Sequence, residues 1–458
     1  MAFSELQRVA IAGTGFLADA YDLYIIGQVQ TVLFKQYPVD EDEKEHFKSL
    51  LSSAALVGAI IGQLVFGSLA DWLGRKVIFV VTGCTIVLGS ILSASAQASL
   101  FGSDERQIFY QIALGRLILG IGIGGEYPLS ATIASESSSA RRRGTLMALV
   151  FSMQGVGYLL SATVMLALAY AHASHELTWR FALAFGGMVP LLSLYFRLRM
   201  EENTAFREVQ QARSEGTATV SQGASAWKYR WHILGTALNW AVFDIVFYAN
   251  GLFNEDVTAS LQHGTSIEAS MLKTFIIVII QLPGYLAAVL TINRMGRKNM
   301  QLMGFVMMSV LFLLISFTYP SLKENPALFL TLYGLTFFCS NWGPNTTTYI
   351  IPGEIYPPQI KATSHGLSAA AGKAGATVGA ATFQLFEPKT SELGLQHAML
   401  ACGVCACVGV VLTLFLTPRY EAEDLEKRQD GETVGFVALP WQPVREDQRS
   451  LVRAGGSA

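Results

Sequence analysis

Runs of about twenty apolar residues recur along the whole chain, and this recurrence constrains the fold more than any other feature. A helix of that length crosses the hydrocarbon core of a bilayer. Of the 458 residues 52% are hydrophobic and 14% are charged, whereas a soluble domain carries roughly 25% charged residues. Transmembrane helices are predicted over residues 9–33, 50–70, 77–98, 109–134, 145–169, 180–198, 231–253, 272–292, 299–318, 326–351, 362–386 and 396–417. The chain is therefore predicted to be an all-α membrane protein with twelve spans.

A polar segment divides these spans into two sets of six. We expect an N-terminal half over 1–199, a cytoplasmic linker over 200–230, a second half over 231–417 and a disordered cytoplasmic tail over 418–458. A loop motif repeats at matching positions of the two halves, as Gly67-Ser-Leu-Ala-Asp71-Trp-Leu-Gly74-Arg75-Lys76 and as Asn293-Arg-Met-Gly296-Arg297-Lys298. Internal repeats of this kind are typical of secondary transporters.

Basic residues gather on alternate connections between the predicted spans. These clusters are Arg75 and Lys76, Arg141 to Arg143, Arg197 with the linker arginines, and Arg294, Arg297 and Lys298. The excess of Lys and Arg on cytoplasmic loops places both termini in the cytoplasm. The first span continues too far to be the apolar core of a cleaved signal peptide. We expect a multi-pass protein of the plasma membrane.

Three glycines at 120, 122 and 125 match the G-x-G-x-x-G pattern of a dinucleotide-binding loop. That loop requires a preceding strand and a following soluble helix, whereas these glycines lie inside an apolar span. Gly120 and Gly124 instead form GxxxG, which lets membrane helices approach closely. The five cysteines lie inside spans without metal-site spacing. We expect no cofactor, no metal and no nucleic-acid partner.

A few ionisable residues interrupt the otherwise apolar spans. Each charge near the bilayer centre costs about 2.5–3.5 kcal/mol on insertion scales, so such residues usually serve a function. The residues are Asp19 and Asp22 in the first span, Arg116 and Glu126 in the fourth, Asp244 in the seventh and Lys373 in the eleventh. Asp19 and Asp22 share a helix face. For Arg116, a packing or snorkelling role is an equal alternative.

Two further patterns indicate a polar interior. Trp240, Asp244 and Tyr248 are spaced by four residues and form a stripe about 12 Å long on one helix face. Such a stripe suits a polar cavity better than lipid. Pro344, within Asn341-Trp-Gly-Pro344-Asn345, is expected to break the tenth span, and Pro352 to close it.

The balance of buried charge leaves two kinds of substrate open. Four carboxylates stand against Lys373 and Arg116. Such a cavity would accept a cation, or an anion that enters once some carboxylates are protonated. The residues alone do not choose between these alternatives.

Four segments resemble one group of transporters specifically. GTGFLADAYDLYIIGQV, GIGIGGEYPLSATIASE, VFSMQG and NWGPNTTTYIIPGEIYPPQIKATSHGLSAAAGKAGA are similar to the phosphate:proton symporters of the major facilitator superfamily, which include fungal high-affinity and plant root phosphate transporters. The resemblance implies the major facilitator fold of two six-helix pseudo-repeats. It also implies proton-coupled uptake of inorganic phosphate by alternating access, in a monomer that is not an enzyme.

The same resemblance assigns roles to individual residues. The implied phosphate site consists of Tyr127, Gln154, Trp240, Asp244, Tyr248, Asn345 and Lys373. The implied proton-coupling acids are Asp19, Asp22 and Glu126, the last at a position where the family usually has Asp. The first loop motif resembles the superfamily's signature, which implies a cytoplasmic latch of Gly67, Asp71, Gly74, Arg75 and Lys76. Asp244 could accept a hydrogen bond from a phosphate hydroxyl, which sulfate lacks near neutral pH.

Several alternatives remain beside phosphate:proton symport. A carrier of glycerophosphodiesters or other organic anions would need a wider site than Trp240 and Tyr248 leave. A carrier of organic cations or sugars would agree with the charge count alone. A nutrient receptor would be expected to carry a longer structured cytoplasmic extension. Sodium could replace the proton as the coupling ion.

Overall fold

A computed structural model describes residues 4–97, 105–215, 226–252, 267–384 and 392–420. Every regular element in these ranges is a helix. The helices are α1 (Glu5–Gln36), α2 (Glu41–Leu73), α3 (Arg75–Ala94), α4 (Gln107–Ser137), α5 (Ala140–Tyr170), α6 (His175–Gly186), α7 (Met188–Arg199), α8 (Thr204–Ser214), α10 (Arg230–Leu252), α12 (Ile267–Met295), α13 (Arg297–Leu322), α14 (Pro326–Asn341), α15 (Pro344–Ile355), α16 (Lys361–Gln384) and α17 (Glu392–Leu416). The predicted tail lies outside the described residues beyond Tyr420.

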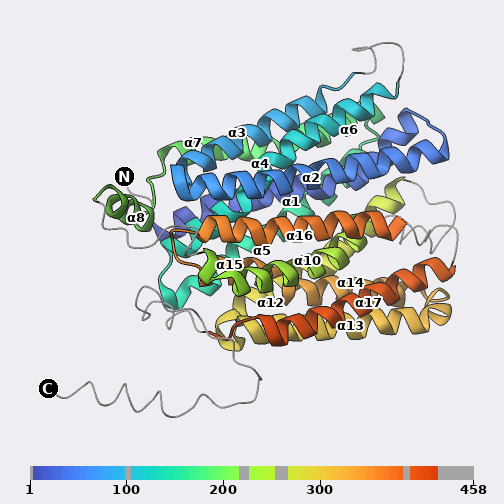
Figure 1. Ribbon diagram of the computed structural model, residues 1–458. Helices are drawn as coiled ribbons and strands as arrows, with labels where there is room; N and C mark the ends of the chain where they lie inside the picture. Colours follow the sequence, from blue (N-terminus) through green and yellow to red (C-terminus); the bar gives the residue numbers. More distant parts are fainter. Residues whose placement is uncertain (1–3, 98–104, 216–225, 253–266, 385–391, 421–458) are drawn as a thin grey trace.

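These helices make twelve crossings, so the all-α membrane prediction is confirmed. Within the described ranges ten helical segments are long and apolar enough to span a bilayer, with α6 and α7 counted as one. The other two crossings are α16 and the broken pair α14 and α15. Figure 1 shows the long helices side by side, with the start of α1 and the end of α17 at the same end of the bundle. We call this end the terminal end.

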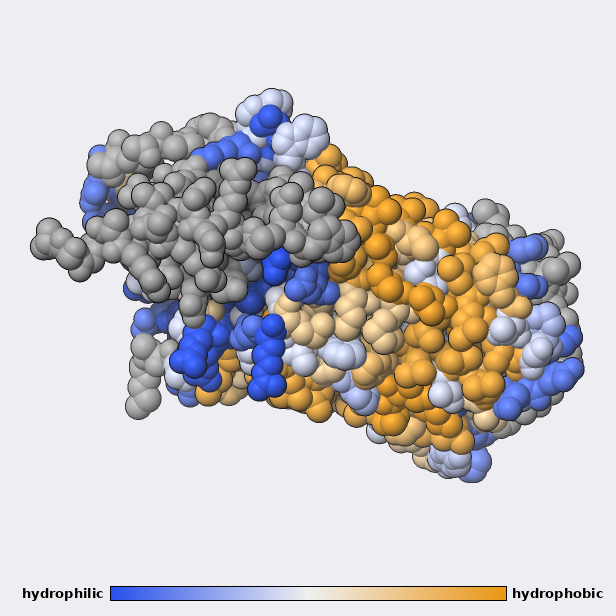
Figure 2. All heavy atoms as spheres, turned by 90° about the horizontal axis from the view of Figure 1, so that it is seen from below, coloured by the Kyte–Doolittle hydropathy of each residue, from blue (hydrophilic) through white to orange (hydrophobic). Residues whose placement is uncertain are grey.

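The outer surface of the bundle is apolar across its middle. Figure 2 shows a broad hydrophobic band between two more hydrophilic ends. Large side chains such as Leu290 and Phe317 are 64% and 70% exposed. Soluble proteins rarely expose contiguous apolar surface of this extent, so the band is the lipid-facing surface.

Glycines allow neighbouring helices to pack backbone against backbone. A methyl group added at Gly124 of α4 would meet the Ala59 carbonyl of α2, and one at Gly62 would meet the Ile121 carbonyl of α4. In the second half, Gly375 of α16 lies against the Ala241 carbonyl of α10. The glycines of the fourth span are therefore helix-packing residues, as predicted, and the dinucleotide-loop interpretation is excluded.

The prediction that Pro352 ends the tenth span is wrong. Helix α15 continues through Pro352 to Ile355. A proline inside a helix removes one backbone hydrogen bond, but membrane helices tolerate it where neighbouring groups satisfy the freed backbone. Every residue of α15 is buried in protein, so packing on all sides holds the helix together. Pro128 likewise lies within α4 without ending it.

Replacing Gly124 with alanine is expected to destabilise the bundle, because the three atoms nearest to the new methyl group all belong to the backbone of α2. Overpacking of this kind costs about 1–3 kcal/mol. We expect a lower midpoint of thermal unfolding in detergent. The matched control is Gly251→Ala in α10, where a methyl group meets no described atom within 4 Å. Equal midpoints for the two variants would contradict this packing.

Candidate functional site

A buried lysine lies at the centre of the bundle, between residues of both halves. Lys373 of α16 donates hydrogen bonds to Asp244 Oδ2 at 3.1 Å and to the Tyr248 hydroxyl at 2.7 Å, both on α10. Its ammonium lies 4.9 Å from the ring centre of Tyr127 on α4. The Tyr127 ring in turn lies 6.1 Å from Trp240. Five of the seven predicted binding residues thus form one cluster, which we call the Lys373 cluster.

The other two predicted residues form a second polar group that joins the two halves. Gln154 of α5 accepts hydrogen bonds from the Tyr285 hydroxyl at 2.8 Å and from Asn345 at 2.9 Å. Asn345 also donates to Asn341 at 2.7 Å. Sequence reasoning missed Tyr285, because one tyrosine in a long apolar run carries no distinguishing signal. Asn341 could have been found from its place in the motif around Pro344.

The break in the tenth span places Asn345 at a helix start. Helix α14 ends at Asn341 and α15 begins at Pro344, so the span breaks where Pro344 predicts. Hydroxyl groups bind two of the carbonyls at the break, since Thr346 donates to the Asn341 carbonyl at 2.7 Å and Thr347 to the Gly343 carbonyl at 3.1 Å. Irregular backbone at membrane depth is stable where protein supplies such partners.

The two carboxylates of the first span are buried. Asp19 and Asp22 are each 1% exposed. Among the described residues, both carboxylate oxygens of Asp19 and one of Asp22 lack a hydrogen-bond partner. Arg116 donates to the backbone carbonyls of Asp22 at 3.2 Å and Leu51 at 2.9 Å. Arg116 is itself buried, so it ties α4 to α1 and α2 and does not snorkel.

Glu126 forms a fully buried ion pair that the sequence did not reveal. Arg197 of α7 binds both of its carboxylate oxygens, at 2.6 Å and 3.0 Å. The Thr82 hydroxyl of α3 donates to the same carboxylate at 2.6 Å. The sequence interpretation counted Arg197 among the basic residues of a cytoplasmic connection. Nothing in the local sequence distinguishes it from Arg199, which is exposed.

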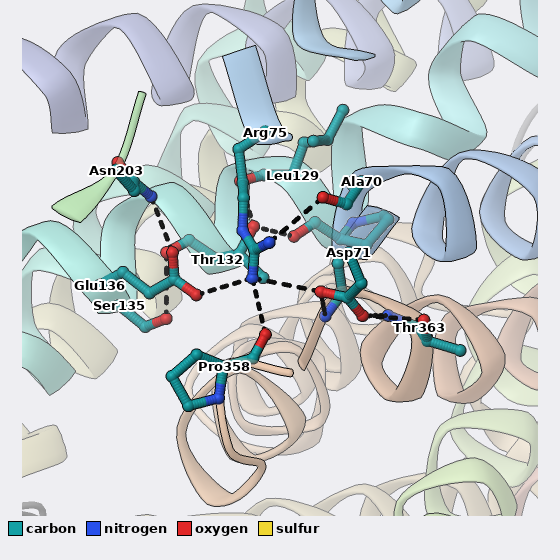
Figure 3. A network of polar contacts seen from close by, with 12 residues as sticks. Ala70, Asp71, Arg75, Leu129, Thr132, Ser135, Glu136, Asn203, Pro358 and Thr363 are labelled. Atoms are coloured by element: carbon teal, nitrogen blue, oxygen red, sulfur yellow. Dashed lines mark hydrogen bonds and ion pairs between the residues drawn. The ribbon is translucent and has the colours of Figure 1, made fainter. Parts of the chain in front are cut away.

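The loop motif of the first half binds the start of α16 at the terminal end (Figure 3). Asp71 accepts hydrogen bonds from the backbone N–H and the hydroxyl of Thr363, both at 2.8 Å. Arg75 binds Glu136 at 3.1 Å and the Pro358 carbonyl at 2.8 Å. Since Thr363 and Pro358 belong to the second half, these contacts hold the two halves together. We call this group the latch.

Glycines and a linker residue complete the latch. A methyl group at Gly67 would crowd the Ala362 carbonyl of α16, so glycine permits the close approach of the two helices. Gly74 has a φ of 107°, a conformation that favours glycine. After this turn the Arg75 and Lys76 N–H groups donate to Glu202, both at 3.1 Å. The polar linker therefore caps the start of α3.

The second half repeats these contacts. Asn293 of α12 donates to the Arg141 carbonyl at 3.2 Å and to the Thr145 hydroxyl at 2.8 Å, at the start of α5. Arg297 binds both carboxylate oxygens of Glu354, at 2.9 Å and 2.7 Å. Asn293 therefore hydrogen-bonds the start of α5 in the first half, just as Asp71 hydrogen-bonds the start of α16 in the second half. The sequence repeat is thus also a structural repeat.

Comparisons with known proteins agree on one family. The profile of the family described as "Sugar (and other) transporter" matches residues 8–225 and 199–430. The "Low affinity inorganic phosphate transporter 4" of Lotus japonicus is 32% identical, over 97% of this chain and 96% of that protein. The "Probable inorganic phosphate transporter 1-6" of Arabidopsis thaliana is 33% identical, over 94% of each chain.

A solved structure matches the fold. The proton:xylose symporter XylE, from E. coli, superposes with a TM-score of 0.78 at 18% identity, over 92% of this chain and 98% of that one. At this identity the likeness concerns the fold alone. It agrees with the predicted arrangement of two six-helix pseudo-repeats.

Loss of the Asp71 carboxylate is expected to open the terminal end. Met147 of α5 is fully buried against Gly353 of the other half, so a cysteine at this position reports on separation of the halves. Hydrogen bonds to a charged group contribute about 1.5–3 kcal/mol each. In a background without native cysteines, we expect Asp71→Ala to raise the maleimide labelling rate of Met147→Cys at least about fivefold.

The control for this experiment is Asp40→Ala, at the other end of α2. It removes the same side chain without touching the latch. An unchanged labelling rate in the Asp71 variant would contradict a role for this carboxylate in closure.

Proposed function

The chain belongs to the inorganic phosphate transporters of the sugar (and other) transporter family, and we propose that it carries inorganic phosphate into the cytoplasm together with protons. The observation that supports this most directly is the Lys373 cluster. It places a buried cation, paired with Asp244, beside the neutral side chains of Tyr248 and Tyr127, where the two halves meet. Such an arrangement suits a small anion.

The phosphate site we propose contains the Lys373 cluster and the Gln154 group. Lys373 supplies a compact positive charge. Tyr127, Trp240, Tyr248, Gln154 and Asn345 supply neutral donors for phosphate oxygens. Asp244 accepts a hydrogen bond from a phosphate hydroxyl. The ring centres of Tyr127 and Trp240 are 6.1 Å apart, which favours a small anion over a glycerophosphodiester.

Protons make the entry of an anion beside several carboxylates possible. We propose that proton coupling depends on three buried acids, Asp19, Asp22 and Glu126. An anion arriving near a carboxylate favours its protonated form. Protons taken up from outside would therefore accompany phosphate, and both would leave on the cytoplasmic side.

Alternating access follows from the contacts between the halves. We propose that residues 1–199 and 231–417 rock about the central site, with residues 200–230 as the linker between them. In this arrangement the latch, with Gly67, Asp71, Gly74, Arg75 and Lys76, closes the cytoplasmic side. The terminal end then faces the cytoplasm. We further propose a plasma-membrane protein that works as a monomer.

Uptake of labelled phosphate into proteoliposomes tests this function. We expect accumulation when the outside is acidic, and loss of accumulation when an uncoupler dissipates the pH gradient. Lys373→Ala should abolish uptake, because Asp244 would then be a buried carboxylate without its cation. A matched control is Lys228→Ala, an exposed lysine of the linker. Uptake driven by a sodium gradient would show that sodium, and not the proton, is the coupling ion. Competition of phosphate uptake by glycerophosphocholine would overturn the proposal that inorganic phosphate is the substrate.

Asp244→Asn is expected to weaken selection against sulfate. The carboxylate accepts a hydrogen bond that phosphate can donate and sulfate cannot, whereas an amide can also donate to sulfate. One unmatched buried hydrogen bond costs about 1–3 kcal/mol, so the preference for phosphate over sulfate should narrow about fivefold or more. The measurement is inhibition of phosphate uptake by sulfate in both proteins. Identical inhibition constants would exclude Asp244 as a selectivity residue.

A further inference from the structure

The ion pair between Glu126 and Arg197 is saturated with hydrogen bonds. Besides the two contacts to Glu126, Arg197 donates to the Phe79 carbonyl at 2.8 Å and to the Ser193 hydroxyl at 3.0 Å. Its guanidinium carbon also lies 3.9 Å from the centre of the Phe79 ring. Both side chains of the pair are 0% exposed. Glu126 and Arg197 therefore fix each other between α3, α4 and α7.

Gly15 of α1 provides the space for this pair. A methyl group at Gly15 would overlap Glu126 Oε2 and would lie 3.4 Å from Arg197 Nη2. A flexible side chain could move away from such a group, but Arg197 and Thr82 hold this carboxylate on both oxygens. Glycine at position 15 is therefore matched to the length and position of Glu126.

Asp19 has the opposite environment. Its two oxygens lack hydrogen-bond partners among the described residues. The charged groups that act on it electrostatically are Glu126 of α4, Arg197 of α7, Asp22 of its own helix and Lys373 of α16. An ionised carboxylate without hydrogen bonds is costly in a buried site, whereas a neutral acid there is much less so.

A carrier of the transported proton must change its charge during the cycle. Protonation of Glu126 would leave Arg197 as a buried charge without its anion, which is strongly unfavourable. Protonation of Asp19 breaks no hydrogen bond that the structure contains. Asp19 and Glu126 therefore differ in how costly their protonation is, although in the sequence both are single carboxylates inside apolar spans.

We propose that Arg197 is a positioning residue that keeps Glu126 ion-paired and immobile, that Gly15 makes the space for this pair, and that the transported proton is carried by Asp19 and not by Glu126. The inference rests on the proposed function. It deepens that function by assigning the coupling step to one of three acids. Arg197 acts on the coupling site only through Glu126.

Two transport assays separate these roles in proteoliposomes. Phosphate exchange, with phosphate on both sides and no pH gradient, needs no net proton movement. Accumulation driven by a pH gradient does. We expect Asp19→Asn to retain exchange and to lose pH-driven accumulation. We expect Glu126→Gln and Arg197→Met each to lose both activities, because each leaves one buried charge alone.

The double variant Glu126→Gln/Arg197→Met decides between the acids. With both charges removed, we expect exchange and pH-driven accumulation to recover to within about tenfold of the wild-type rates, since a buried ion pair can often be replaced by neutral side chains. Arg199→Met, at the exposed neighbouring arginine, is the matched control and should behave as wild type. A double variant that exchanges phosphate but does not accumulate it would overturn the proposal, as would pH-driven accumulation by Asp19→Asn.

A second pair of variants remains informative if the double variant does not fold. Gly15→Ala should lower exchange and accumulation together, leaving the pH profile of transport unchanged. Gly15→Ala/Glu126→Asp should recover part of both, because the shorter acid withdraws from the new methyl group. A shifted pH profile of transport in Gly15→Ala would overturn the proposed role of Gly15. So would a double variant Gly15→Ala/Glu126→Asp that recovers neither exchange nor accumulation. Absence of phosphate exchange by the wild-type protein would instead refute the proposed function.

Discussion

The structure depends on one constraint, that a polar group placed at membrane depth must find its partner inside the protein. Water does not satisfy such a group there, and each unsatisfied one costs several kcal/mol. At two central positions this chain meets the constraint with ion pairs that join different helices. Glu126 of α4 binds Arg197 of α7, and Lys373 of α16 binds Asp244 of α10. The buried charges are therefore also the contacts that fix helices relative to one another.

Helix α16 connects the two levels at which the halves meet. Thr363, which binds Asp71 in the latch, lies ten residues before Lys373 on the same helix. At 1.5 Å per residue the two positions are about 15 Å apart along the axis. A rigid helix transmits a displacement at one position to the other. Binding at the centre and closure at the terminal end can thus be coupled without any further element.

The sequence predicts those parts of this architecture that depend on one helix at a time. Span positions follow from hydropathy, and the break at Pro344 follows from the chemistry of proline. Contacts between side chains of different helices could not be predicted, because the sequence does not state which spans are neighbours. Arg197 and Arg199 are two residues apart in one short helix, yet one is buried against Glu126 and the other is exposed. What distinguishes them is the position of α7 against α1 and α3, from which Arg197 reaches Glu126 of α4.

The two central ion pairs differ in how readily an arriving anion could displace one of their partners. Arg197 is held by a carboxylate, a carbonyl, a hydroxyl and a ring, none of which an arriving anion would displace. Lys373 has a single carboxylate contact at 3.1 Å and a tyrosine hydroxyl, and a phosphate could compete for both. Asp244 would then lose its cation but gain the phosphate hydroxyl as a donor. The Lys373–Asp244 pair, which can exchange partners, thus lies in the proposed binding site. The Glu126–Arg197 pair, which cannot, lies beside Asp19, and its fixed charges leave Asp19 as the acid that can gain and lose a proton.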